Sequence, residues 1–144
     1  MVTQRGFTLL ELITAIAVVA IVVTMAMPSF SNLMAKQGLN SSIRELAGTL
    51  SLARAQAVLL RREVTVTLNS ASPSTQTAFF WAPSSTKDSL TSSTTSVVFR
   101  VDGTVKDATA DQDFTVCNSR LGRSKTITLT RTGTQYTKSE GVCT

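Results

Sequence analysis

FTLLELITAIAVVAIVVTMAMPSF, residues 7–30, decides the fold of this chain, because Glu11 is the only charged residue in it. A helix of this length and polarity can cross about 30 Å of hydrocarbon. A lone carboxylate at the head of such a segment costs roughly 2.5–3.5 kcal/mol on membrane-insertion scales. The stretch therefore predicts a membrane-spanning helix whose acid is compensated by another group.

The residues around the apolar run do not match a secretory signal peptide. Such a peptide has a small-residue cleavage site after its apolar region, whereas here Gly6 precedes the run. Cleavage after Gly6 would leave the helix attached and create an α-amino group on Phe7, which is largely protonated near neutral pH. Glu11 is four residues from Phe7 and could pair with this amine or with that of an adjacent copy. An ordinary anchor with a glutamate near the interface is the alternative.

The helical pattern continues beyond the apolar run. Pro28 predicts a kink near residues 24–28, because proline removes a helical hydrogen bond and clashes with the preceding turn. An apolar stripe with alternating spacings of four and three follows, at Leu39, Ile43, Leu46, Leu50, Ala53, Ala57 and Leu60. We expect one helix from Phe7 to about Leu60, with its second half packed on a sheet. Pairing as a coiled coil is the other use of this stripe.

Composition limits the chemistry. The chain of 144 residues has a formal net charge of +5 and no histidine, which removes the commonest general base and metal ligand. Its two cysteines, Cys117 and Cys143, favour a disulfide in an exported domain; two unrelated thiols are the alternative. No phosphate-binding loop or catalytic constellation is recognisable, so we expect no catalytic residue, metal or cofactor.

Short strands are predicted after residue 63. Alternation or apolar clustering marks Val64–Leu68, Ala78–Trp81, Val97–Val101, Thr104–Val105, Phe114–Cys117, Thr126–Thr130 and Gln135–Thr137. Asp102-Gly103 is typical of a two-residue hairpin, and Thr132-Gly133 predicts another turn. Together with the long helix, these strands indicate an α+β fold in which an antiparallel sheet covers the helical stripe.

Two polar segments interrupt the strands. Residues 70–77 read as a turn-rich loop, and residues 84–96 as a solvated, mobile Ser/Thr-rich loop, either a spacer or a glycosylated or partner-binding segment. Asp107, Asp111 and Asp113 do not fit a calcium loop and are interpreted as a solvated loop.

Positive charge gathers at the C-terminal end. Residues 114–144 carry five basic residues and one acid, whereas residues 7–113 are balanced. The basic residues are Arg120, Arg123, Lys125, Arg131 and Lys138. Such an asymmetry favours contact with DNA phosphates; a solvated surface, or one that meets an acidic patch on another subunit, is the alternative.

GFTLLE, residues 6–11, resembles the class III signal of type IV pilins and type II secretion pseudopilins. The resemblance implies that a prepilin peptidase cuts between Gly6 and Phe7 and N-methylates Phe7. It also implies that Glu11 neutralises the amine of a neighbouring subunit in the filament, and that the helix can stretch or melt around Pro28.

Over nearly its full length the chain resembles the GspH/FimT family of minor pilins and pseudopilins. The resemblance rests on IRELAGTLSLARAQAVLLRREVTV (43–66), VFRVDGTV (98–105), FTVC (114–117) and TITLTRTG (126–133). It implies a pilin-like fold with a leader at 1–6, a transmembrane helix at 7–30, an amphipathic helix at 31–62 and a disulfide-bonded β-sheet domain at 63–144.

The same resemblance implies a function and partners. A minor pilin of a type IV pilus lies in the inner membrane with its globular domain in the periplasm, then enters the filament at the cell surface and helps to initiate assembly. Its partners are other pilins, the prepilin peptidase and the inner-membrane assembly platform. The alternative is a type II secretion pseudopilin.

Some FimT-like members bind DNA during natural transformation through a GRxR sequence after the penultimate strand. This chain has Gly133-Thr134-Gln135-Tyr136 there, without either arginine, and a GRSK sequence earlier, at residues 122–125. The basic C-terminal residues are therefore candidates for double-stranded DNA contact through phosphates.

Overall fold

The computed structural model describes residues 7–143, without the side chains of residues 25, 26 and 28. The chain divides into two compact units, Met1–Met34 and Ala35–Thr144, and helix α1 (Leu9–Leu60) contributes to both. The expected leader at 1–6, including Gly6, lies outside the described residues. The helical backbone is continuous at Pro28, whose side chain also lies outside them, and the kink stays a prediction.

The first unit exposes its apolar surface. Side chains such as Leu9, Ile16 and Val22 are more than half exposed, and none of the apolar window of the helix is buried within the structure. This segment of α1 is long and apolar enough to cross a membrane. An apolar surface of this size needs lipid or other helices to cover it.

In the second unit α1 buries the predicted stripe. Leu39, Ile43, Leu46, Leu50, Ala53 and Ala57 are all in the core, and Leu60 is half-buried. Arg61 then ends the helix in the left-handed region (φ 50°), and the Arg62 amide donates to the Ala57 carbonyl at 3.3 Å. This is a Schellman ending built on arginine instead of glycine. It releases the chain into the first strand only a few residues later.

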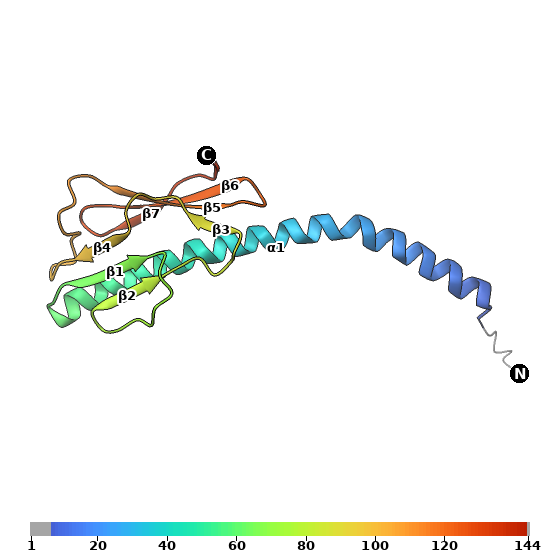
Figure 1. The fold of residues 1–144 in the computed structure, drawn as a ribbon, viewed down its shortest axis with the longest axis horizontal. Helices are drawn as coiled ribbons and strands as arrows, with labels where there is room; N and C mark the ends of the chain where they lie inside the picture. Colours follow the sequence, from blue (N-terminus) through green and yellow to red (C-terminus); the bar gives the residue numbers. More distant parts are fainter. Residues whose placement is uncertain (1–6, 144) are drawn as a thin grey trace, which may run out of the picture. The chain divides into compact units, whose positions relative to one another are not determined.

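The strands of the second unit lie along this part of α1 (Figure 1). The first sheet has the order β2-β1-β4, from β1 (Val64–Leu68), β2 (Ala78–Trp81) and β4 (Ser96–Phe99). β4 pairs with β1 antiparallel, but β2 pairs with β1 parallel, so the expectation of purely antiparallel pairing was wrong here. The parallel register sets buried Phe79 beside Val66 and buried Trp81 beside Leu68. The buried side chains of β1 and β2 therefore lie on the same face of this sheet.

The second sheet is antiparallel throughout its described strands. It has the order β3-β5-β6-β7, from β3 (Asp88–Leu90), β5 (Gln112–Asn118), β6 (Arg123–Leu129) and β7 (Gln135–Thr137), and β8 (Gly141–Val142) pairs with β6. β5 and β6 extend beyond the predicted strands, because Cys117 pairs with Ser124 and Asn118 with Arg123. Arg123 and Lys125 consequently lie in a strand and not in the connecting loop.

The Ser/Thr-rich segment 84–96 is more ordered than its composition indicated. β3 lies inside it, Asp88 is buried, and the Thr91 amide donates to the Thr115 carbonyl at 2.9 Å. The Ser92 hydroxyl also donates to the Asp113 carbonyl at 2.8 Å. Interpreting the segment as a mobile loop was therefore wrong, because its hydroxyls and amides bond to the edge of the sheet.

Two matching turns join strands at the same end of the unit. Gly103 donates to the Arg100 carbonyl and Gly133 to the Thr130 carbonyl, each at 2.9 Å, and both glycines have φ near +80°. Three residues, not two, separate Arg100 from its partner Thr104, so the predicted two-residue hairpin at Asp102-Gly103 was wrong. A three-residue loop with glycine in the left-handed position is the next commonest hairpin connection.

Candidate functional site

The head of α1 carries a helix cap. The Glu11 amide donates to the Thr8 hydroxyl at 3.2 Å, which is half of a Thr-x-x-Glu capping box. The Glu11 carboxylate is exposed and has no partner within residues 7–143, and Phe7 is 84% exposed. An acid in the first turn also interacts favourably with the helix dipole. Phe7 and Glu11 are therefore both accessible to a neighbouring molecule.

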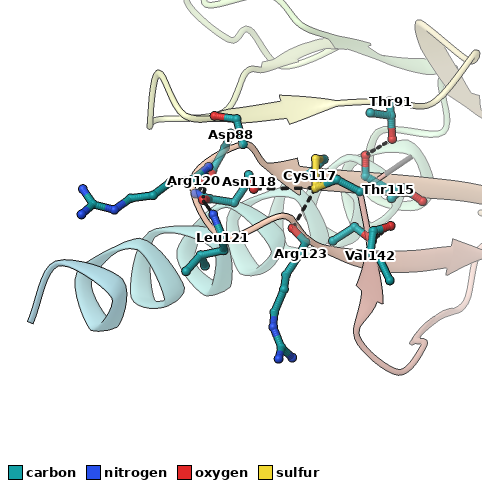
Figure 2. Close-up of a disulfide and its surroundings, with 12 residues drawn as sticks. Asp88, Thr91, Thr115, Cys117, Asn118, Arg120, Leu121, Arg123 and Val142 are labelled. Carbon is teal, nitrogen blue, oxygen red and sulfur yellow. Dashed lines mark hydrogen bonds between the residues drawn. A yellow bond between two sulfur atoms is a disulfide. The ribbon is translucent and has the colours of Figure 1, made fainter. Parts of the chain in front are cut away.

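The C-terminal segment is fastened to β5 and β6. Cys117 and Cys143 form a disulfide with a Cα–Cα distance of 5.6 Å, shown in Figure 2. The Cys143 amide donates to the Gly122 carbonyl at 3.0 Å, and β8 pairs with the start of β6. The basic segment after Cys117 is therefore held at both of its ends.

A buried polar network positions the turn between β5 and β6. Ser42 of α1 donates to Asp88 Oδ2 at 2.7 Å, and the amide group of Asn118 donates to Asp88 Oδ1 at 2.5 Å. The side-chain oxygen of Asn118 accepts from the amides of Arg120 and Leu121 at 3.1 and 3.0 Å. Sequence reasoning missed this network, because Asp88 lies in a stretch whose composition indicates solvent exposure.

Arg123 and Lys125 share one carboxylate. Lys125 Nζ lies 3.1 Å from Glu140 Oε1, and Arg123 Nη1 lies 3.5 Å from Glu140 Oε2. The hydrogen bond from Lys125 lowers the pKa of Glu140, and Lys36 and Arg123 add to the effect. Two of the basic candidates are therefore partly neutralised inside the chain.

Lys138 is paired on another part of the sheet. Its ammonium lies 2.6 Å from Asp113 Oδ2, and Thr128 donates to the other carboxylate oxygen at 2.6 Å. The bond from Lys138, followed by that from Thr128, lowers the pKa of Asp113, and the same contact raises the pKa of Lys138. This pair ties the residue just after β7 to β5, across β6.

The five basic candidates do not converge on one patch. Arg120 lies in the turn before β6 and Arg131 in the turn after it, so the whole strand separates them. Figure 2 shows the side chains of Arg120, in the turn, and of Arg123, at the start of β6, extending in different directions. Arg120 and Arg131 are exposed, whereas Lys125 is half-buried. The exposed basic residues Arg120 and Arg131 therefore lie at opposite ends of β6 and do not line one groove.

The three aspartates interpreted as a loop have separate partners. Asp107 pairs with Arg100 at 3.4 Å, and Asp111 accepts from the Arg131 amide at 3.3 Å, whereas Asp113 binds Lys138. Among residues 7–143, no group of three or more His, Cys, Asp or Glu side chains is arranged to hold a metal ion.

Comparison with known proteins gives two family matches. Residues 42–133 match the model described as type II transport protein GspH, and residues 1–27 match the prokaryotic N-terminal methylation motif. No curated protein matches the chain.

Two crystal structures of the type IV minor pilin FimU from Pseudomonas aeruginosa, in different space groups, are similar in fold. One is 15% identical, covering 72% of this chain and 90% of that chain, with a TM-score of 0.58. The other is 18% identical, covering 70% and 93%, with a TM-score of 0.53. The expected pilin-like α+β fold, a long N-terminal helix packed against β-sheets, is confirmed.

Proposed function

Because this chain belongs to the type II transport protein GspH family of structural, non-enzymatic minor pilins and pseudopilins, we propose that it is a minor pilin of a type IV pilus. In this proposal a prepilin peptidase cuts after Gly6 and methylates Phe7. The subunit waits in the inner membrane with its globular unit in the periplasm. It then joins other pilins at the assembly platform and helps to start the filament.

The observation that carries the proposal is the exposed apolar helix headed by an unpaired acid. The methylation motif spans residues 1–27, and the side chains of residues 9–24 of α1 are all exposed. Lipid covers them before assembly, and other helices cover them in a filament. Glu11 favours the second state, because the amine of a neighbouring subunit compensates a charge that hydrocarbon does not.

A type II secretion pseudopilin is the second candidate, and the description of the matching family model favours it. The likeness to FimU concerns the fold, which both kinds of subunit share. The two candidates differ in the process that fails when the protein is lost. Deleting the gene should abolish or reduce surface pili while leaving protein secretion intact; the reverse result would assign the chain to secretion.

Glu11→Gln tests the assembly role of the acid. The variant keeps the size and the helix cap but cannot form an ion pair, so we expect it in the membrane fraction and not in sheared filaments. Glu45→Gln is the matched control, because Glu45 is exposed and its carboxylate accepts only from Ser41 within the described residues. Filament incorporation of Glu11→Gln at the level of the control would contradict the role.

DNA capture is a further part of the proposal, and it rests on the charge of residues 114–144. Arg131 is exposed and its side chain has no partner among the described residues, so it is the first candidate for a phosphate contact. Arg120 is exposed in the turn before β6. Binding of this kind is sequence-independent and weakens with salt.

Retardation of double-stranded DNA by the full chain in detergent micelles tests this part. Replacing Arg131 by alanine should weaken binding for all sequences and reduce the salt slope by about one unit, as expected for one lost phosphate contact. Arg100→Ala is the control, because that exposed arginine is already paired with Asp107. Equal binding by Arg120→Ala, Arg131→Ala and the control would end the DNA proposal without affecting the pilin one.

A further inference from the structure

Lys36, Asn40 and Arg44 recur at every fourth position of α1, so they lie along one face of the helix. Arg123 and Lys125 alternate on β6, on the same side of the strand as buried Ile127. That side faces the helical core. Beyond the end of the core, polar residues of the helix and of the sheet therefore face one another.

A pocket of about 290 Å³ lies at this place in the second unit. Its walls include Asn40, Ile43 and Arg44 of α1, together with Lys125 of β6 and Thr137 of β7. The walls thus combine cationic, amide and hydroxyl groups with one aliphatic side chain. A pocket with this lining suits an organic anion that has a short apolar stem.

The charges around the pocket are unbalanced. Glu140 is held by Lys125 and Arg123, and Lys36 is close enough to help lower the pKa of this carboxyl. Arg44 is exposed, and its guanidinium has no partner among the described residues. Lys138, which also lines the pocket, is already paired with Asp113. Glu140 therefore serves several of the other cations, and the guanidinium of Arg44 is left to bind a further anion.

We propose that this pocket, which we call the helix–sheet pocket, receives an acidic side chain from a neighbouring protein subunit and binds it through Arg44, Asn40 and Lys125. The proposal rests on the proposed function as a filament subunit, because that function supplies the neighbour. The ion pair between Lys125 and Glu140 shows that Lys125 accepts a carboxylate partner. A second carboxylate would set the register between subunits more than it would add affinity, as charged contacts at interfaces do.

The geometry favours an acidic peptide over duplex DNA. A volume of about 290 Å³ accepts one or two side chains, and the phosphates of a duplex would need cations that protrude from the surface. Lys125 is instead half-buried, and Ile43 in the wall offers contact to methylene groups. Phosphate binding by the exposed residues Arg120 and Arg131 would be a separate event.

Binding of a fluorescent tetraglutamate peptide to the full chain in detergent micelles tests the proposal, with tetraglutamine as the uncharged control peptide. We expect binding of tetraglutamate only, weakening as salt rises. Arg44→Ala should lower the affinity about fivefold, the size of one exposed ion pair. Arg62→Ala removes an exposed cation just beyond the end of α1 and should leave binding within twofold of the original.

Three results would overturn the proposal: no binding of tetraglutamate, equal effects of the two substitutions, or displacement of the peptide by inorganic phosphate at equal concentration. Binding of a double-stranded DNA oligonucleotide that depends on Arg44, without peptide binding, would assign the pocket to nucleic acid instead. If the protein is absent from filaments, the proposed function as a filament subunit is contradicted. The measured binding of the peptide to the pocket still stands in that case. The two failures are therefore distinguishable.

Discussion

At the scale of single residues, Arg54 and two glycines hold the ends of two hairpins together. Arg54 Nε donates to the Gly103 carbonyl at 3.1 Å, and the Val105 amide donates to the Arg131 carbonyl at 2.9 Å. A Cβ on Gly133 would overlap the Gly103 carbonyl oxygen and lie 2.8 Å from Arg54 Nε. The absence of a side chain at this point lets the two turns meet over the helix.

Gly133→Ala should therefore destabilise the second unit by roughly 2–4 kcal/mol, from backbone strain at φ +79° and from overlap with a neighbouring backbone. Gly122→Ala is the matched control: its φ is +61°, but a Cβ there has open space, so we expect a loss of only about 1 kcal/mol. Urea unfolding of the full chain in micelles measures both. Equal losses would show that the two turns are not packed as described.

The pair between Lys138 and Asp113 predicts how stability changes with acidity. The pKa of Asp113 is lowered by folding, so its contribution is present above the unfolded value of about 4 and is lost as the pH falls further. Glu140 has a lowered pKa and acts in the same direction. The raised pKa of Lys138 means that its own contribution is lost only in strong alkali.

We accordingly expect the unfolding temperature to fall below about pH 4, and to fall less steeply in Asp113→Asn and Lys138→Met than in the original chain. Lys87→Met, which removes an exposed lysine elsewhere, should retain the original slope. Thermal melts at several pH values provide the test. If the unfolding temperature of both Asp113→Asn and Lys138→Met falls with pH as steeply as that of the original chain, this ion pair does not cause the acid sensitivity.

At the scale of elements, the disulfide determines whether the C-terminal strand stays on the sheet. β8 is short and exposed, and it pairs only with the start of β6 in the described part of the chain. The bond closes a loop with a sequence separation of 26, which the chain-entropy model values at about 3 kcal/mol. Without the bond, the ladder between β6 and β8 has little to hold it.

Replacing both Cys117 and Cys143 by serine should cost about 3 kcal/mol and speed hydrogen exchange of the amides at 141–143. The amide of Ile127, in the buried part of β6, provides the internal control and should remain protected. A variant that keeps slow exchange at 141–143 would show that strand pairing alone fastens the segment.

Sequence patterns predicted the elements whose burial alternates regularly. The helical stripe from Leu39 to Ala57 and the strand Val64–Leu68 are in the structure because one face of each is buried. β3 escaped prediction because it has only three residues, Asp88–Leu90, which are too few to show an alternating pattern. The strand β2 was predicted, but its parallel pairing with β1 was not, because the direction of pairing depends on tertiary contacts.

At the scale of the whole molecule, the candidate sites also differ in how far the sequence could reveal them. The N-terminal motif is contiguous, so Phe7 and Glu11 could be singled out as candidates from the sequence. The basic residues are spread over the C-terminal segment, and only the fold separates Arg131 from Arg120 and pairs Lys138 with Asp113. Lys36 and Arg44 were missed, although their spacing of eight residues was visible, because their relation to β6 is tertiary.

The central claim is that this chain becomes a filament subunit through cleavage and methylation at the head of its apolar helix. Mass spectrometry of the protein purified from its own membranes tests the claim most directly. We predict a chain that begins at Phe7 and carries one added methyl group on its amine. A protein that retains Met1, or that begins after residue 27, would contradict the account.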